Sequence, residues 1–353
     1  MFGTYRTLLA LMVVFLHLGG VSVLGGYAVF GFYILSGYLM TFIMQNNYGY
    51  DRTGLAKYAL NRVLRIYPIY WLSCVISMIL IIYFGQDVTL GFHPAITMPS
   101  DFSSIMRNLF LYFPGREIPR LTPPSWALTV EIFYYICIGL GVSRSRQLTG
   151  YWFVASIIYT GYVNIAALGW EHKYFSILAA SLPFSTGALV FHYREELKRI
   201  SGKLASGFNA PLFICALIGL NWWAGLVLDT LKGISFYINY ILCAFMIVVL
   251  FDRKKLPLIS RRIDKIMGDF SYPIYLIHFQ VGLVIMILLN VNGFDIKHPS
   301  LTLAYLSLPA IFLVAWVMTV SVERPIELIR SKVKSITPII AKAEMAPENN
   351  KFI

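Results

Sequence analysis

Two ionisable side chains, Arg6 and His17, lie within the first apolar segment of this chain, residues 5–24. Ionisable groups are rare at bilayer depth and are usually functional there. A separation of 11 residues turns an α-helix about 20° past three full turns, so both side chains share one face, about 16 Å apart along the axis. A neutral imidazole can serve as a general base or an acyl-accepting nucleophile near neutral pH. His17 is therefore a candidate catalytic residue with Arg6 beside it, although an intramembrane histidine often only hydrogen-bonds two helices.

A second basic pair, Arg62 and Arg65, lies at i,i+3 on one helical face just before another apolar run. Tyr67, Tyr70 and Trp71 follow the pair, and two guanidinium groups beside aromatic rings suit a nucleotide that carries phosphates. The alternative is that the two arginines only fix topology and contact anionic lipid heads. With Arg6, the pair puts positive charge at two places around one possible pocket.

Further polar side chains stand at bilayer depth. Glu131 lies six residues into an apolar segment, where it could orient His17 or Arg6, bind a sugar hydroxyl or anchor two helices. Ser271, Tyr275 and His278 fall at i, i+4 and i+7, which is one helical face. These hydroxyls and this imidazole are expected to line a polar space.

The composition is typical of a polytopic membrane protein. Of 353 residues, 58% are hydrophobic and 13% are charged, and the mean hydropathy is +0.68. Windows of about 20 mainly apolar residues, enough to cross about 30 Å of hydrocarbon, predict an all-α fold with about ten transmembrane helices. They lie at 5–24, 26–44, 68–84, 125–142, 149–168, 175–193, 208–228, 234–251, 270–290 and 300–322.

The basic residues predict the orientation of these helices. In a soluble protein a net charge of +12 would suggest an anionic partner such as nucleic acid, but here we expect no nucleic-acid partner. With the N-terminus inside, all but six of the 29 Lys and Arg residues fall on the cytoplasmic side, so both termini are predicted to be cytoplasmic. The six predicted to lie outside are Arg107, Arg116, Arg120, Lys173, Lys232 and Lys297.

The chain is expected to form one integral membrane domain over residues 1–330 and a polar cytoplasmic tail over 331–353. The four cysteines have no paired spacing, so neither a disulfide framework nor a metal site is predicted. The longest stretch outside the membrane, 85–124, is rich in proline and aromatic residues. It could cap an outer opening or simply rest on the bilayer as a connector.

Six motifs, taken in order, resemble the acyltransferase-3 family of integral membrane acyltransferases, typified by O-acetyltransferases of bacterial surface polysaccharides. The motifs are the Arg6–His17 spacing, the Ser-Gly signature at Ser36, Arg62-Val-Leu-Arg65, Ser125-Trp-Ala-Leu-Thr-Val-Glu131, the run from Gly268 to His278, and Glu323-Arg-Pro. In the fourth motif Ala127 departs from the family pattern, which usually has serine there. In the last motif Arg324 follows Glu323 and could neutralise it.

The resemblance implies transfer of an acyl group, usually acetyl, from acetyl-coenzyme A to a carbohydrate hydroxyl at a bacterial inner membrane. It implies that His17 is general base or transient acyl carrier, that Arg6 and Glu131 assist it, and that Arg62 and Arg65 bind the donor. Acyl-coenzyme A and a carbohydrate acceptor are then the expected partners, and no permanently bound cofactor is expected. The remaining motif residues, Ser36, Ser271, Tyr275, His278 and Glu323, are second-tier candidates for the same pocket.

Many members of the family carry an extra hydrolase-like domain outside the membrane. These 353 residues hold none, so we expect the chain to act alone or with a separate partner. The rival interpretation is a proton-coupled secondary transporter or glycolipid exporter, because embedded Arg, His and Glu also suit a carrier. The lack of a visible inverted repeat argues against a carrier. A non-catalytic scaffold for glycan assembly is disfavoured by the number of ionisable groups at bilayer depth.

Overall fold

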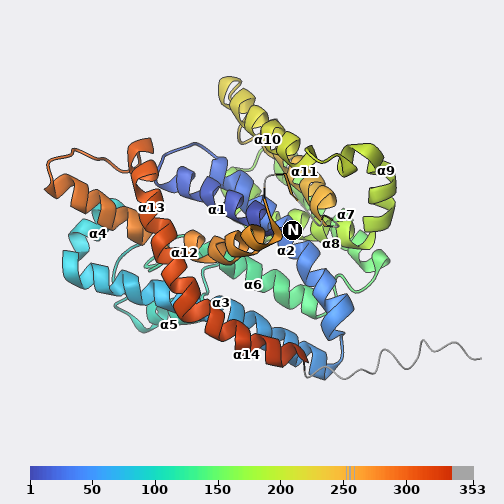
Figure 1. Ribbon diagram of the computed structural model, residues 1–353, viewed down its shortest axis with the longest axis horizontal. Coiled ribbons are helices and arrows are strands. Elements are labelled where there is room, and N and C mark those ends of the chain that lie inside the picture. The colour runs from blue at the N-terminus through green and yellow to red at the C-terminus, as the bar shows by residue number, and fades with distance from the viewer. Residues whose placement is uncertain (252, 254–255, 258, 336–353) are drawn as a thin grey trace, which may run out of the picture.

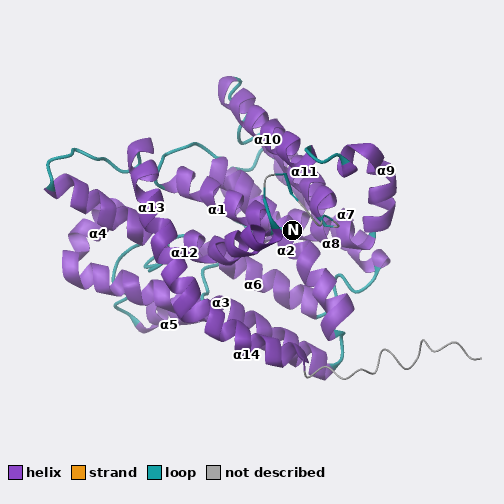
Figure 2. Cartoon of the chain, viewed as in Figure 1, coloured by secondary structure: helices purple, strands orange, loops and turns teal. Residues whose placement is uncertain are grey.

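The computed structural model of the chain describes residues 1–335, apart from 252, 254–255 and 258 (Figure 1). The described residues form helices and connecting loops, with no β-strand among them (Figure 2). The predicted all-α fold class is therefore confirmed. The helices are α1 Gly3–His17, α2 Leu24–Ile43, α3 Arg52–Phe84, α4 Gln86–Phe92, α5 Phe102–Phe110, α6 Ser125–Gly139, α7 Arg146–Ile165, α8 Ser181–His192, α9 Arg194–Ser206, α10 Ala210–Val227, α11 Ile234–Leu250, α12 Arg261–Val291, α13 Leu301–Met318 and α14 Arg324–Ser335, with short π or 3₁₀ turns η1 Met44–Tyr48, η2 Glu171–Phe175, η3 Ile177–Ala180 and η4 Thr319–Glu323.

Within the described part of the chain, five helical segments are long and apolar enough to cross a membrane. They are Leu24–Tyr48, Arg52–Phe84, Ala210–Val227, Arg261–Val291 and Leu301–Val333. Shorter apolar helices occupy Gly3–His17, Ser125–Gly139, Ile177–His192 and Ile234–Leu250. All ten predicted windows contain helix, but ten spans and cytoplasmic termini stay predictions. Of the predicted tail, α14 continues to Ser335 and residues 336–353 lie outside the described residues.

Two helices begin well before their predicted apolar windows. α3 starts at Arg52, where the Asp51 carboxylate accepts a hydrogen bond from Thr53 N at 3.2 Å. α12 starts at Arg261, where Ser260 Oγ accepts from Ile263 N at 3.3 Å. Hydropathy missed these first turns because they are polar, whereas the caps satisfy their free N–H groups. A helix of 33 residues is about 50 Å long, so α3 exceeds the hydrocarbon thickness.

Glycine lets α2 and α8 pack at backbone contact. A Cβ atom on Gly187 of α8 would lie 1.9 Å from the Ile34 carbonyl oxygen, and one on Gly37 of α2 would lie 2.1 Å from the Phe184 carbonyl oxygen. Small residues allow this approach between apolar helices, where dispersion and close packing drive association. This close packing fixes the residues that α2 presents to the cavities described below.

α12 caps the N-terminus of α1. The Asp264 carboxylate accepts hydrogen bonds from Gly3 N at 3.2 Å and Thr4 N at 2.9 Å, which satisfies N–H groups that a helix start leaves free. A Cβ on Gly3 would lie 1.7 Å from the Asp264 carbonyl oxygen, and one on Gly268 would lie 2.8 Å from Gly3 Cα. This backbone contact between α1 and α12 therefore fixes the register of the two helices, that is, which residues of α1 lie beside which residues of α12.

The segment 85–124 is packed into the helices rather than resting beside them. The α5 end places three carbonyl groups, of residues 108–110, against α3. Tyr70 donates to the Asn108 carbonyl at 2.7 Å. Trp71 donates to the carbonyl of residue 109 and Tyr67 to that of residue 110, each at 3.0 Å. These aromatic residues therefore satisfy the last carbonyls of a helix, and whether they also flank a nucleotide stays a prediction. In Figure 1, α4 and α5 lie at the opposite end of the molecule from α9.

Candidate functional site

An inner cavity of about 110 Å³ lies among α1, α2, α3, α6 and α12. Seven of the residues singled out in the sequence line it, together with aromatic and aliphatic side chains. The seven are Arg6, Ser36, Arg62, Arg65, Glu131, Ser271 and Tyr275. The fold thus gathers three guanidinium groups and one carboxylate, drawn from helices far apart in the chain, around one space.

The three guanidinium groups differ in how they are held. Arg6 forms no ion pair or side-chain hydrogen bond with the residues that the structure describes, so its charge is available to the cavity. Arg62 donates to Asn61 Oδ1 at 2.7 Å and lies 5.9 Å from the Tyr135 ring centroid. Neither contact neutralises a full charge, so the cavity retains positive potential for an anionic ligand.

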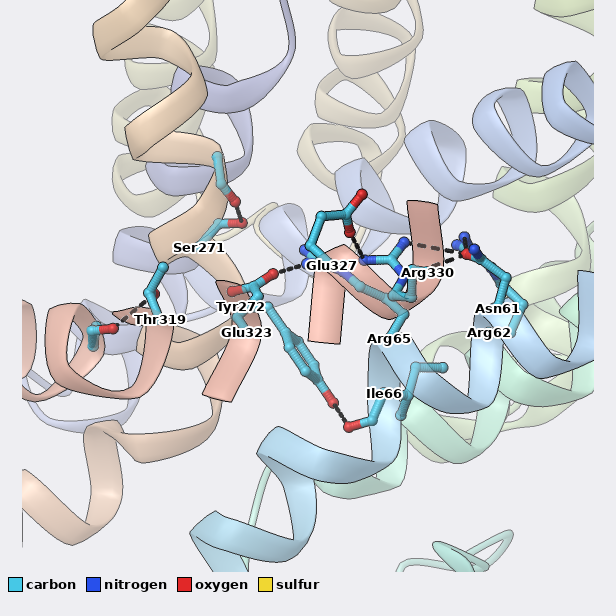
Figure 3. A network of polar contacts seen from close by, with 12 residues as sticks. Asn61, Arg62, Arg65, Ile66, Ser271, Tyr272, Thr319, Glu323, Glu327 and Arg330 are labelled. Atoms are coloured by element: carbon cyan, nitrogen blue, oxygen red, sulfur yellow. Dashed lines mark hydrogen bonds and ion pairs between the residues drawn. The ribbon is translucent and has the colours of Figure 1, made fainter. Parts of the chain in front are cut away.

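Arg65 forms an ion pair with Glu323, the last residue of η4 (Figure 3). The interpretation that Arg324 neutralises Glu323 is therefore wrong, because the partner comes from α3. Tyr272 donates to the Ile66 carbonyl at 2.8 Å and closes the same corner. Glu323 is 8% exposed, so this carboxylate has its compensating charge within the protein.

Arg330 adds a basic residue that sequence reasoning missed. Its side chain is 7% exposed and pairs with Glu327. Its Nη2 also donates to Asn61 Oδ1 at 3.2 Å, the same oxygen that binds Arg62 (Figure 3). Asn61 thereby links α14 to α3 and fixes the Arg62 guanidinium. Arg330 is the last residue before the predicted tail, and no local sequence pattern identified it as a site residue.

Glu131 lies in the inner cavity and not against His17. Ser36 Oγ donates to its Oε1 at 2.6 Å, and the Tyr135 hydroxyl donates to the same oxygen. Tyr135 stands four residues along α6, which is why the two side chains share a face. Of the roles considered for Glu131, orienting His17 is wrong because the imidazole has a different partner.

That partner is His278 of α12, whose Nε2 lies 2.9 Å from His17 Nδ1. His278 Nδ1 lies 3.3 Å from the Ile274 carbonyl oxygen, which only accepts, so in the neutral ring Nδ1 carries the proton and Nε2 the lone pair. His17 Nδ1–H therefore donates to His278. His17 Nε2 is left with a lone pair and makes no hydrogen bond with any described residue. His278 has the orienting relation to His17 that a third group has in nucleophile–base–orienter sites.

His17 lines a second, outer cavity of about 100 Å³. Its other imidazole and its two guanidinium groups come from the 85–124 segment, so this segment closes part of the cavity, while its place on the outer side stays a prediction. Val29 and Tyr275 line both cavities and stand where they adjoin. The Tyr275 hydroxyl donates to the Pro124 carbonyl at 2.8 Å, which fixes this partition. The outer cavity also contains His93, Arg116 and Arg120, none of which was predicted to be a site residue.

The arrangement places a space lined by three guanidinium groups next to a space lined by His17. Among the described residues, no group of three His, Cys, Asp or Glu side chains lies close enough to hold a metal ion. The Pro-rich stretch with two arginines at 114–124 was a signal for the outer cavity, but its sequence does not show which side of the helices it packs against.

A family model described as an acyltransferase domain, Acyl_transf_3, matches residues 4–320. The chain belongs to the acyltransferase-3 family. The match includes every residue described above at the two cavities. No curated protein and no solved structure matches the chain. Family membership and the apolar helices support a multi-pass membrane acyltransferase, as the six motifs predicted.

Proposed function

We propose that this acyltransferase-3 protein is an O-acyltransferase of the bacterial inner membrane. In this proposal it moves an acyl group, most simply acetyl, from cytoplasmic acyl-coenzyme A to a hydroxyl of a surface polysaccharide or a lipid-linked glycan. The supporting observation is the pair of adjoining cavities, one with three guanidinium groups and the other with a histidine base. A phosphate-bearing thioester and a neutral hydroxyl call for these two environments.

In the proposed reaction, Arg62 and Arg65 bind the donor phosphates and Arg6 stabilises negative charge nearer the thioester. His17 Nε2 takes the proton of the acceptor hydroxyl while the hydroxyl oxygen attacks the thioester carbonyl carbon. The carbon–sulfur bond breaks, and the proton passes from the imidazolium to the coenzyme A thiolate. Glu131, which accepts hydrogen bonds from Ser36 and Tyr135, limits the positive charge of the inner cavity.

The test uses the full chain purified in detergent, radiolabelled acetyl-coenzyme A, and surface glycan from a strain that lacks the gene. We expect label on the glycan, no transfer by His17→Ala, and a raised donor KM for Arg62→Ala. His172→Ala is the matched histidine control, because His172 is exposed and lines neither cavity. Arg52→Ala is the matched arginine control on α3, exposed at the helix start.

Full activity of His17→Ala would refute its assignment as the base. An unchanged donor KM for Arg62→Ala would make that arginine a topology signal only. Absence of label, with export of an unmodified glycan that depends on the gene, would favour the transporter interpretation instead.

A further inference from the structure

The outer cavity holds basic side chains that the acyl-transfer step does not use. Arg116 and Arg120 line it beside His17, and His93 completes its polar wall. No Asp or Glu is among its described lining residues. Proton abstraction from a neutral hydroxyl requires only His17, so the two guanidinium groups need another explanation.

Arg120 is buried without a compensating carboxylate. Its side chain is 4% exposed, and its Nε donates to the Pro123 carbonyl at 2.6 Å. Its Nη1 donates to the Glu117 carbonyl at 3.3 Å, and no described acidic side chain forms an ion pair with it. Carbonyl dipoles leave its net charge in place, and a buried unpaired charge is expensive. Burial lowers the pKa of Arg120 to about 10, yet the group remains a cation at neutral pH.

Arg116 is held in place over an aromatic ring. Its guanidinium carbon lies 3.8 Å from the Phe175 ring centroid, and its backbone has a φ of 62°, which non-glycine residues seldom adopt. Nη1 forms an exposed ion pair with Glu171 at 3.1 Å, whereas Nε is buried with no hydrogen-bond partner. The stacked guanidinium therefore has an unused donor as well as a weakly held charge.

His93 supplies a neutral donor to the same wall. Its Nδ1 accepts a hydrogen bond from Ala95 N at 3.1 Å, so its Nε2 carries the proton. Burial, then the nearby Arg120 charge, lower the pKa of His93 to about 4, so the ring is neutral at pH 7. Two aromatic residues also line the cavity, Trp126 and Phe175, with ring centroids 4.8 Å apart in an edge-to-face arrangement. Flat rings of this kind suit the apolar face of a sugar.

We infer that the outer cavity selects an acceptor that carries an anionic group, a carboxylate or a phosphate, near the hydroxyl that is acylated. Arg120 and Arg116 bind the anion, the aromatic lining contributed by Trp126 contacts the sugar face, and the hydroxyl lies toward His17. This inference rests on the proposed function and deepens it by naming the acceptor class. Charge-assisted hydrogen bonds to two guanidinium groups give the specificity that apolar contacts lack.

The experiment separates surface glycan of a strain without the gene into acidic and neutral fractions and offers each to the purified full chain with labelled acetyl-coenzyme A. We expect label in the acidic fraction. Arg120→Gln should raise the acceptor KM about 10- to 150-fold, because a lost hydrogen bond to a buried charge is worth roughly 1.5–3 kcal/mol. The donor KM should not change, since Arg120 does not line the inner cavity.

Two further variants keep the test valid if Arg120→Gln does not fold. Arg116→Gln should also raise the acceptor KM, whereas Glu171→Gln should lower it about two- to fivefold by freeing Arg116 from an exposed pair. Arg107→Gln is the matched control, because it removes the same charge from the neighbouring α5 and does not line the cavity.

Label in the neutral fraction, or an acceptor KM that neither arginine variant changes, would overturn the inference and leave acyl transfer standing. A rise in the donor KM with Arg120→Gln would assign this cation to coenzyme A phosphate and also overturn it. If the wild-type chain labels no fraction and does not consume acetyl-coenzyme A, the proposed function itself fails.

Discussion

Replacing His278 by phenylalanine should impair the chemical step and leave donor binding intact. His278 is fully buried, and its ring lies parallel to that of His17 with the centroids 5.1 Å apart. Phenylalanine fills the same space but cannot accept the His17 Nδ1 proton. A buried donor without a partner costs about 1–3 kcal/mol, and each 1.36 kcal/mol is tenfold in rate, so we expect kcat to fall about 5- to 150-fold.

The assay is steady-state acetyl transfer by the purified chain in detergent, with kcat and the donor KM measured separately. His278→Gln is the control for packing, because its amide oxygen reaches about as far as Nε2 and can accept from His17. We expect the glutamine variant to recover much of the lost kcat. Size-exclusion chromatography and thermal unfolding must first show that both variants are folded.

A folded His278→Phe variant with wild-type kcat would refute the argument that His278 fixes the His17 tautomer. Equal loss in both variants would also count against it, because ring packing and not the accepted hydrogen bond would then explain the effect. A change confined to the donor KM would place His278 in donor binding.

Three more predictions concern stability, each measured as the shift of thermal unfolding in detergent. Arg65→Met should destabilise the chain by about 3 kcal/mol or more by leaving Glu323 buried and unpaired, and adding Glu323→Met should recover part of the loss; no recovery would contradict a compensated buried pair. Gly187→Ala should lower the midpoint, because a Cβ there would lie 1.9 Å from a backbone oxygen, whereas Gly161→Ala, with nothing within 4 Å, should not; equal shifts would refute the close approach. The depressed pKa of His93 means that the unfolded chain binds its proton first, so stability falls as the pH drops from about 6.5 toward 4, and His93→Gln should show a smaller fall; an identical fall would contradict the burial argument.

Local sequence patterns were sufficient for the fold class and for the faces of single helices. Apolar windows predicted the helices because burial in hydrocarbon selects composition, but polar caps such as Asp51 lengthened α3 beyond its window. Helical periodicity placed Arg62 and Arg65 toward one cavity, as it placed Ser271 and Tyr275. Periodicity repeats within one helix, so it shows which residues share a face and not what that face meets.

The partners across helices were decided only by tertiary structure. Arg6 and His17 share one helix, as the 11-residue spacing requires, yet they line different cavities because α1 runs past the partition at Tyr275. His278 reaches His17 over 261 positions because Gly3 lets the backbones of α1 and α12 touch and so sets their register. Composition and spacing thus determined an all-α membrane protein with a basic face on two of its helices, and the motifs gave the resemblance to a family of acyltransferases. Backbone contacts between distant segments, which no local pattern encodes, determined which of those faces form a site.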